Sequence, residues 1–440
     1  MFETVRNAFK IKDLRKKILY TFFALIVVRI GCQLPVPGVD ASVITDFFDS
    51  QKSLDFFNQL TGGSFSTMSI FALNITPYIT ASIIIQLLTI AIPKLEELHK
   101  DGEEGRKKLA EYTRYLTIAL SVIESAAMAI GFGQQGYLTD GVTFTSVAVF
   151  VVSLTAGSAF LMWLGEQITE KGVGNGISII LLYNIVSRMP EDMMNLFEKF
   201  VKGASNVTNG TIAAVVILAV IIGMVIFIVV LSDGERRISV QYSKKTQGRK
   251  MVGGQSSHIP LKVNTAGVIP VIFAGSLFSM PFAGIKPQSG AGATLAQKFL
   301  KVLNQNSWCN LSSFGEFKYT LGLVIYILLL IFFAYFYTSI TFNPQEISIN
   351  MKKQGGFIPG IRPGKPTVDY LTKVLNNIIL IGAVGLSFVA FVPIFVSGAF
   401  GADVSFGGTS LIIIVGVVLE TLKQIESQML VRHYKGFISE

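Results

Sequence analysis

Long apolar runs limit the folds open to this chain more than any other feature of its sequence. Residues 20–30, 212–231 and 321–333 are mostly apolar, and they are too continuous for a helix with one solvated face. A helix needs about 20 mostly apolar residues to cross the hydrocarbon core of a bilayer. Charged residues make up 15% of the chain, against roughly 25% in a soluble domain. We therefore expect an all-α membrane protein.

Ten segments are expected to span the membrane, and the basic residues between them predict their orientation. With the N-terminus taken as cytoplasmic, 28 of the 37 Lys and Arg residues fall on the cytoplasmic side. Short cytoplasmic loops are enriched in Lys and Arg, so we expect both termini in the cytoplasm. The basic, amphipathic residues 1–17 predict a helix on the membrane surface. The ten spans lie near residues 18–34, 74–92, 115–133, 143–164, 176–190, 211–231, 264–284, 317–341, 371–398 and 407–428.

The ten spans divide into two sets of five, which we take as halves covering residues 1–205 and 206–440. The second span of each set is interrupted by proline after an asparagine: Asn74 and Pro77 in the first set, Asn264 and Pro270 in the second. If this is a true repeat, an odd number of spans in each set makes the second half inverted relative to the first, as in many transporters.

A short segment before the second span, residues 62–71, fits neither a span nor a free loop. It is too short and polar to cross a bilayer, and it is too apolar for a solvated loop. Two interpretations are open. It is a re-entrant helix, buried in protein at membrane depth, or it is an interfacial helix on the outer surface.

Two loops expected in the cytoplasm, near residues 232–263 and 342–370, are basic and also contain patterns that predict defined local structure. In the first, Arg237, Ser239 and Gln241 alternate with Ile238 and Val240, a pattern that predicts a short hairpin strand. In the second, repeated Gly and Pro impose turns around Arg362. A guanidinium held on a rigid turn suits an acidic protein surface or RNA phosphate. The alternative is that these charges act only in topology.

Few residues of the spans are suited to chemistry. Arg29 and Glu124 are the ionisable groups within them, and the chain has no phosphate-binding loop, paired cysteines or clustered histidines. We therefore expect no catalytic residue, no metal site and no cofactor. Three functions are compared: a passive protein-conducting channel, a secondary transporter of a small solute, and a membrane-embedded enzyme. A transporter needs convergent polar groups at the midplane and an enzyme needs a catalytic constellation.

Several blocks of sequence, in order, resemble one known family. They include Phe357-Ile-Pro-Gly-Ile-Arg-Pro-Gly364, residues 69–88, 160–170, 174–178, 261–270 and 406–411. Between about residues 14 and 430 the chain resembles bacterial SecY, the channel subunit of the Sec protein translocase.

This resemblance implies a function and a set of pore residues. The family conducts unfolded secretory proteins across the bacterial inner membrane and releases transmembrane segments sideways into lipid. Its two pseudo-symmetric halves open like a clamshell, and a re-entrant plug helix seals the resting pore. By resemblance, the plug comprises Gly62, Gly63, Ser64, Phe65, Ser66, Thr67, Met68, Ser69, Ile70 and Phe71. The pore ring comprises Ile75, Ile79, Ile177, Leu181, Ile272 and Ile413, where Leu181 replaces the more common Ile.

The resemblance also implies a lateral gate, a docking surface and partners. The expected gate residues are Thr76, Gln86, Glu124 and Asn264, and a carboxylate at position 124 is not general in the family. The expected docking residues are Lys244, Lys245, Arg249, Lys250 and Arg362. The partners implied are the small subunits SecE and SecG, the SecA motor ATPase, the ribosome, secretory preproteins with their signal peptides, and membrane lipids.

Overall fold

The computed structural model describes most of the chain as two compact units. One unit contains the described residues up to Leu196 together with those from Ile413 onward, and the other contains the described residues from Phe197 to Ile412. The halves expected at 1–205 and 206–440 stay a prediction. The described residues are 2–39, 58, 60–134, 136–139, 141–202, 207–242, 245–247, 250–252, 256–265, 267–279, 302–303, 321–400 and 408–436.

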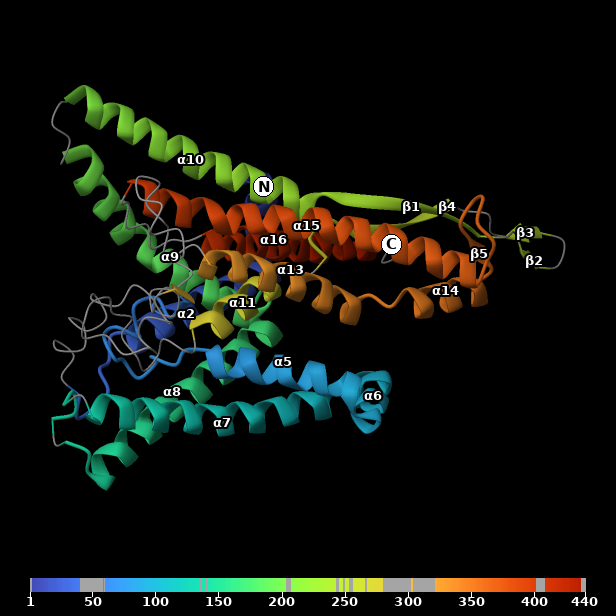
Figure 1. Ribbon diagram of the computed structural model, residues 1–440. Coiled ribbons are helices and arrows are strands. Elements are labelled where there is room, and N and C mark those ends of the chain that lie inside the picture. The colour runs from blue at the N-terminus through green and yellow to red at the C-terminus, as the bar shows by residue number, and fades with distance from the viewer. Residues whose placement is uncertain are drawn as a thin grey trace. The chain divides into compact units, whose positions relative to one another are not determined.

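The first unit is built from helices (Figure 1). Within it, α7 packs against α5 and α8, and α8 packs in turn against α2 and α9. The helix axis bends by 104° between α5 and α6. The break falls at Ile92, which is extended (φ −113°, ψ 111°) because it precedes Pro93. The helices are α1 (Phe2–Lys10), α2 (Lys12–Gly31), α5 (Thr76–Ala91), α6 (Pro93–Lys100), α7 (Gly102–Gln134), α8 (Phe144–Lys171), α9 (Gly176–Leu196) and most of α16 (Gly408–Gly436).

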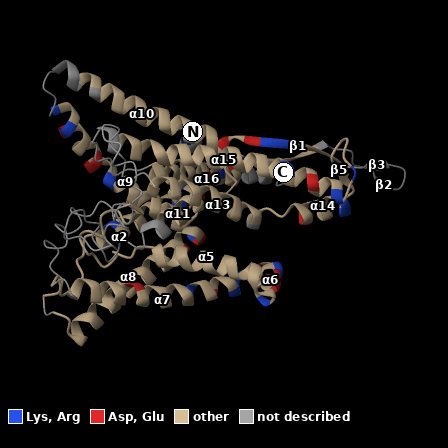
Figure 2. Ribbon diagram, viewed as in Figure 1, with Lys and Arg blue, Asp and Glu red and all other residues tan. Residues whose placement is uncertain are grey.

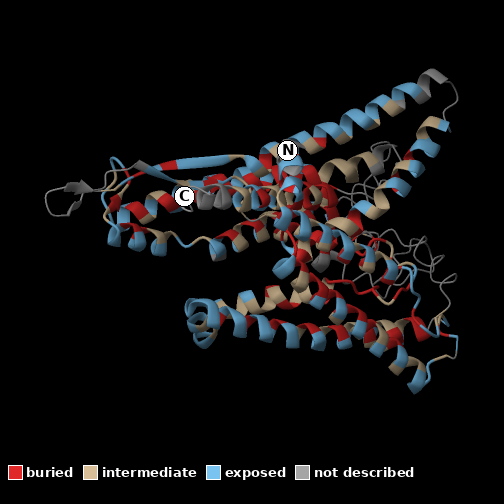
Figure 3. Cartoon of the chain, turned by 180° about the vertical axis from the view of Figure 1, so that it is seen from behind, coloured by how far each residue is buried: buried red, intermediate tan, exposed pale blue. Residues whose placement is uncertain are grey.

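The second unit combines helices with a small sheet. Its helix α13 packs against both α11 and α15, whereas most of α10 is exposed (Figure 3). The strands form a three-stranded antiparallel sheet of order β4-β1-β5 and a separate β2-β3 hairpin. The elements are η2 (Phe197–Lys202), α10 (Val207–Asp233), β1 (Glu235–Tyr242), β2 (Lys245–Gln247), β3 (Lys250–Val252), β4 (Ser256–Lys262), α11 (Ile269–Ser279), α13 (Leu321–Thr341), α14 (Pro344–Lys353), β5 (Gly356–Phe357) and α15 (Lys365–Phe400).

The lengths and composition of these helices make the chain a multi-pass membrane protein. In the described part of the chain, six helices are long and apolar enough to cross a bilayer, and the bent α5–α6 pair would make seven. Helices also occupy each of the ten segments expected to span, which is consistent with the predicted count. The expected membrane fold is confirmed.

The basic N-terminal helix α1 is amphipathic, and its buried side packs against other residues of the first unit. Ala8 of α1 is fully buried, and it shares a small apolar cluster with Leu14, Val173 and Ile425 of the same unit. Arg6 and Lys10 on the other face are exposed. The periodicity of residues 1–17 predicted the helix, but its contact with α16 could not be read from local sequence.

Candidate functional site

The segment 62–71, which we name the seal segment, folds as consecutive turns and not as a regular helix. Its start, Gly62 (φ 66°) and Gly63 (φ 88°), is left-handed, and Met68 (φ 45°) is left-handed within it. Right-handed helix cannot continue through such residues, and a left-handed Met is strained. The segment expected to be the plug is thus compact and largely buried, and it forms turns where a helix was expected; its role as a plug stays a prediction.

The seal segment pairs through its main chain with the residues that follow α2. The amide of Val36 donates to the carbonyl oxygen of Met68 (2.9 Å), and the amide of Ile70 donates to that of Leu34 (2.9 Å). Pro35 and Ser69 form an antiparallel bridge between them. These bonds satisfy backbone groups that would be costly to bury unpaired.

Three polar side chains hold the ends of the segment, and each donates to a main-chain oxygen. The Arg29 guanidinium donates to Gly62 O (3.4 Å) and also to Ser187 Oγ (3.3 Å). Asn74, which follows the segment, donates from Nδ2 to the oxygen of Leu60, which precedes it (2.7 Å), and Ser158 Oγ donates to Asn74 O (3.1 Å). Arg29 thus has a structural partner in the seal segment, which sequence reasoning did not supply.

Glycines let neighbouring helices approach the segment closely. A methyl group at Gly157 of α8 would clash with the carbonyl oxygen of Ile70, and one at Gly31 of α2 would clash with the ring of Phe71. The Phe71 ring also stacks on Phe160 of α8, with centroids 5.9 Å apart. We name these contacting residues of α2, α8 and α9 the seat of the seal segment.

The seat contains a packed apolar cluster, and some of its buried polar atoms lack hydrogen-bond partners among the described residues. Met68, Ala72 and Leu73 are buried in one cluster with Phe150 and Leu154 of α8. Asn74 Oδ1 and Asn184 Nδ2 are buried, and neither has a hydrogen-bond partner within the described part of the chain. Each unpaired buried group costs about 1–3 kcal/mol. The seat therefore combines good apolar packing with a polar penalty.

The expected ring residues lie on several elements. Ile75 directly precedes α5 and Ile79 follows one turn later, while Ile177 and Leu181 are one turn apart on α9. Ile272 lies on α11 and Ile413 on α16, and both are buried. Residues four apart share a helix face, so α5 and α9 each present an aliphatic pair. The assembly of all six into one ring stays a prediction.

The expected gate residues occupy different environments. Gln86 of α5 is exposed, whereas Thr76 and Glu124 are half-buried. The structure gives Glu124 no ion pair or hydrogen bond within the part of the chain it describes. Asn264 lies between β4 and α11, and its Oδ1 is buried without a partner among the described residues. Their role as a gate stays a prediction.

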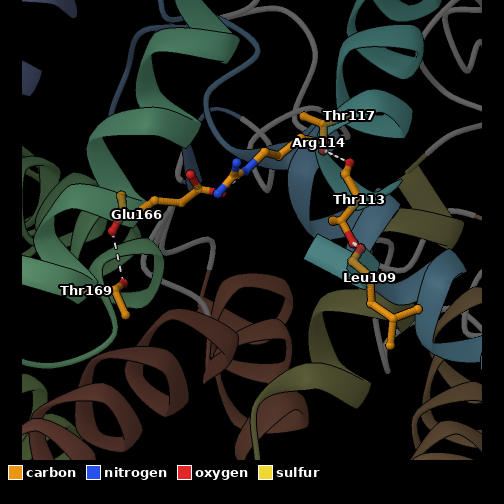
Figure 4. Close-up of polar contacts among 7 residues, drawn as sticks. Leu109, Thr113, Arg114, Thr117, Glu166 and Thr169 are labelled. Atoms are coloured by element: carbon orange, nitrogen blue, oxygen red, sulfur yellow. Dashed lines mark hydrogen bonds and ion pairs between the residues drawn. The ribbon is translucent and has the colours of Figure 1, made fainter. Parts of the chain in front are cut away.

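One polar contact between spans was not anticipated. Arg114 of α7 and Glu166 of α8 point toward each other, with Nε 2.8 Å from Oε1 (Figure 4). Both side chains are partly exposed, so the pair contributes at most about 1 kcal/mol. Below it on α7, Thr117 and Thr113 donate to carbonyl oxygens one turn back. A separation of 52 residues left no sequence signal for this pair.

The two loops expected in the cytoplasm fold together into what we name the platform: β1, β4, β5, α14 and the turn 358–364. The alternation along β1 is confirmed, since Ile238 and Val240 are buried while Arg237, Ser239 and Gln241 are exposed. The buried face packs on Met351 and Ile358 from the second loop. In the described part of the chain, β1 is the central strand and pairs with β4 on one side and β5 on the other.

Arg362 lies exposed on a turn that is fixed from both sides. Gly360 (φ 84°) and Gly364 (φ 104°) are left-handed, as the turn requires. Thr367 Oγ1 donates to Arg362 O (2.9 Å), and Ser348 Oγ donates to Gly364 O (3.2 Å). The predicted Gly/Pro turns are confirmed, and two hydroxyls that the sequence did not single out hold them.

The other expected docking residues lie on or beside the β2-β3 hairpin. Lys245 and Lys250 belong to β2 and β3, and Gln247 pairs with Lys250. Lys244 and Arg249 lie outside the described residues. Charged residues of the second unit gather on β1 and α14 (Figure 2). Among the described residues, no group of three or more His, Cys, Asp or Glu could hold a metal ion.

Comparison with known proteins decides the family. The SecY family model matches residues 69–422. "Protein translocase subunit SecY" of Halalkalibacterium halodurans is 44% identical over 449 residues, and that of Bacillus subtilis is 43% identical over 449 residues. Each alignment covers all of both chains. The chain belongs to the SecY family.

Solved structures show the same fold at low sequence identity. "The structure of a protein conducting channel" matches with a TM-score of 0.63 at 19% identity, and it covers 94% of this chain and 92% of that one. "Sec61 in the Canine ribosome-channel complex from the endoplasmic reticulum" matches with a TM-score of 0.61 at 18% identity and the same coverage. The architecture expected of this SecY-family chain is therefore confirmed.

Proposed function

We propose that the chain forms the central pore of a protein-export translocase. It conducts unfolded secretory proteins across the membrane and releases transmembrane segments laterally into lipid. The seal segment is the observation that carries this proposal. A ten-residue segment of turns, held in a seat between spans by main-chain hydrogen bonds, is a part that a channel needs and a plain helix bundle does not. A fold relative described by its "plug domain", which "stablizes the closed state", supports it.

The seal segment and the ring act in series. In the resting state residues 62–71 occupy their seat, and Ile75, Ile79, Ile177, Leu181, Ile272 and Ile413 close the path. Aliphatic side chains exclude water and offer ions no hydration site, so such a constriction gates by dewetting. When a chain enters, the segment leaves its seat and the ring widens around the extended polypeptide.

Sideways release requires the pore to open toward lipid. Thr76, Gln86, Glu124 and Asn264 form the contacts of this lateral gate. A signal peptide that binds there shifts an equilibrium between closed and open states by its differential affinity for the two. An apolar segment then leaves because burial in lipid gains about 0.8 kcal/mol per methylene.

The platform receives the partner that drives transport. Arg362, with Lys244, Lys245, Arg249 and Lys250, binds the SecA motor or the ribosome. A fold relative solved in a ribosome–channel complex supports ribosome docking. SecE and SecG complete the membrane complex. The pore itself is not an enzyme, because energy enters through the docked partner or the membrane potential.

We place the chain in a bacterial inner membrane, as its bacterial relatives suggest, and the distribution of Lys and Arg supports both termini in the cytoplasm. This places the platform on the side where precursors are made. The secondary-transporter alternative is not favoured, since the relatives are named as translocase subunits.

A crosslink tests the pore directly. Cys32 and Cys309 are replaced by Ser, Ile79 is replaced by Cys, and a secretory precursor with its own single Cys is stalled in transit. We expect a crosslink to the mature part of the precursor. The matched control is Ile123→Cys on α7, where the side chain is 64% exposed and faces outward. Equal crosslinking from both positions, or none from Ile79 during active transport, would contradict the proposed path.

A further inference from the structure

A groove of about 480 Å³ lies within the second unit, between α13 and α15 at the point where α14 begins. This volume is in the range of sites for small molecules, about 300–1,000 Å³. None of the lining residues is among the expected pore, gate or docking residues, although Pro344 and Gln345 begin α14 of the platform. The groove therefore needs a separate explanation.

The lining changes from apolar to polar along its length. Phe332, Phe336 and Ile379 line one part, and Asn343, Gln345 and Thr372 line another. The Tyr335 hydroxyl donates to the main-chain oxygen of Asn376 (3.3 Å), which places the middle of the lined stretch of α13 beside that of α15. Since the chain turns from α13 into α14 at Phe342 and Asn343, the polar part lies at the end of the span and the aromatic part lies deeper.

The position of α13 within the bilayer determines what can occupy the apolar part of the groove. α13 is one of the helices able to cross the bilayer, and Phe332 (57%) and Phe336 (39%) are exposed on it. Water at this depth would lose its own hydrogen bonds without replacing them. An apolar chain fills such a space with contacts on both sides and no such loss.

The polar part suits a phosphate ester. Asn343, Gln345 and Asn376 are amides, each able to donate through NH₂. The Oδ1 of Asn343 already accepts from the amides of Gln345 and Glu346, so its NH₂ is directed to other partners. Lys365 lies seven residues before Thr372 on the same face of α15, about 10 Å along the axis. Amides and an ammonium together bind phosphate oxygens.

We propose that this groove binds one glycerophospholipid, with an acyl chain between α13 and α15 and its phosphate at the amides where α14 begins. The size of the groove argues for a lipid over a partner helix. A helix with side chains is about 10–12 Å across, whereas α13 and α15 pack against each other at the groove, with Tyr335 Oη 3.3 Å from Asn376 O, so the space between them suits a single acyl chain.

Photolabelling tests the site on the full chain in vesicles. The vesicles are phosphatidylcholine with a trace of phosphatidylcholine that carries a diazirine on one acyl chain. Labelled residues are mapped by mass spectrometry. We expect labelling at residues 332–345 and 368–379 to exceed that at Val215 and Val216, which are 62% and 53% exposed on the apolar helix α10.

Two neighbouring asparagines supply a matched pair of variants. Asn376 lines the groove, whereas Asn377 is also exposed on α15 and does not. Asn376→Phe should lower groove labelling about fivefold, which corresponds to about 1 kcal/mol of lost lipid affinity. Asn377→Phe should leave it unchanged.

Each other outcome overturns the proposal. Groove labelling no greater than that of α10 would mean ordinary bilayer lipid. An equal effect of the two substitutions would mean that the groove does not select the lipid. Labelling that disappears when the small membrane subunits are added would mean that a protein helix occupies the groove. None of these results bears on transport through the pore, so the proposed function is tested separately.

Discussion

The seal segment and the platform both contain turns with left-handed residues, but they are held in different ways. The platform rests on a β-ladder of seven residue pairs between β1 and β4, and hydroxyl groups fix its turn at Arg362. The seal segment has two ladder-like bonds, a long bond from Arg29 (3.4 Å), a left-handed Met68 and unpaired amide atoms at Asn74 and Asn184. We infer from this difference that the platform keeps its shape, whereas the seal segment is bound weakly enough to leave its seat.

The largest effect is expected from a substitution in the platform. Arg362→Glu reverses the charge on an exposed, rigid turn. We expect precursor export to fall by about a hundredfold or more, because losing a hydrogen-bonded charge pair in an interface costs about 2–5 kcal/mol. Export into membrane vesicles measures it, and the amount of assembled complex should not change.

The matched control is Lys352→Glu, which makes the same charge change at an exposed position of α14. If both substitutions reduce export equally, the platform contributes only charge and its fixed shape is irrelevant. Normal export by Arg362→Glu would remove Arg362 from the docking surface.

The next effect concerns the seat. Gly157→Ala places a methyl group against the carbonyl oxygen of Ile70, and overpacking of this kind costs about 1–3 kcal/mol. We expect the seal segment to leave its seat more often, so resting ion leak should rise by roughly 5- to 150-fold. Ion flux into vesicles without precursor measures it.

Gly131→Ala on α7 is the control, because a methyl group there meets no neighbour. A leak that rises equally in both variants would reflect general damage to the spans. An unchanged leak in Gly157→Ala would mean that residues 62–71 do not limit ion flow.

A smaller effect tests the long bond at the start of the segment. Arg29→Met removes the donor to Gly62 O and Ser187 Oγ while keeping much of the side-chain volume. The bonds are long, so we expect a loss of about 1 kcal/mol and a roughly fivefold faster exposure of the seat. Cys32 is buried beside the segment (4% exposed), and its alkylation rate in a Cys309→Ser background measures that exposure.

Arg29→Lys separates charge from geometry, because it keeps the charge but not the planar fork of donors. An intermediate alkylation rate is expected. A rate for Arg29→Met equal to that of the parent would show that Arg29 does not retain the segment.

The smallest expected effect tests how the turn at Arg362 is held in the platform. Thr367→Val removes the hydrogen bond to Arg362 O, worth about 0.5–1.5 kcal/mol. Part of this loss should appear as a roughly two- to threefold weaker affinity for the docked partner, measured by titration of the partner onto vesicles. Thr372→Val on the same helix should have no effect. Equal affinities for both variants would show that the turn is held by its glycines alone.

The sequence predicts those parts of the fold that depend on local pattern. Long apolar runs located the helices, the alternation around Ile238 and Val240 gave β1, and Gly/Pro spacing gave the turns at Arg362. The start of α14 was also readable, since Asn343 followed by Pro344 is a typical N-cap and first position. These features need no knowledge of distant partners.

The rest depends on contacts between residues far apart in the chain. No local pattern indicates that Met68 adopts a left-handed conformation, because that conformation follows from pairing with Leu34 and Val36. The pair Arg114–Glu166 and the bond from Arg29 to Gly62 join different helices. The expected plug helix is replaced by turns that bond mostly within the segment, while Met68 O and the amide of Ile70 bond outward to Val36 and Leu34.

The contacts that hold the seal segment have a consequence for how freely its sequence can vary. Its carbonyl or amide groups are met by Leu34, Val36, Arg29 and Gly157, and these groups are the same whatever side chains the segment carries. Natural variants and laboratory libraries should therefore accept many different residues at the less buried polar positions of the segment, Ser66 and Thr67, at little cost in closure. The helices around the segment should accept few changes. We therefore expect selection to conserve the residues that contact the segment more strictly than the segment itself.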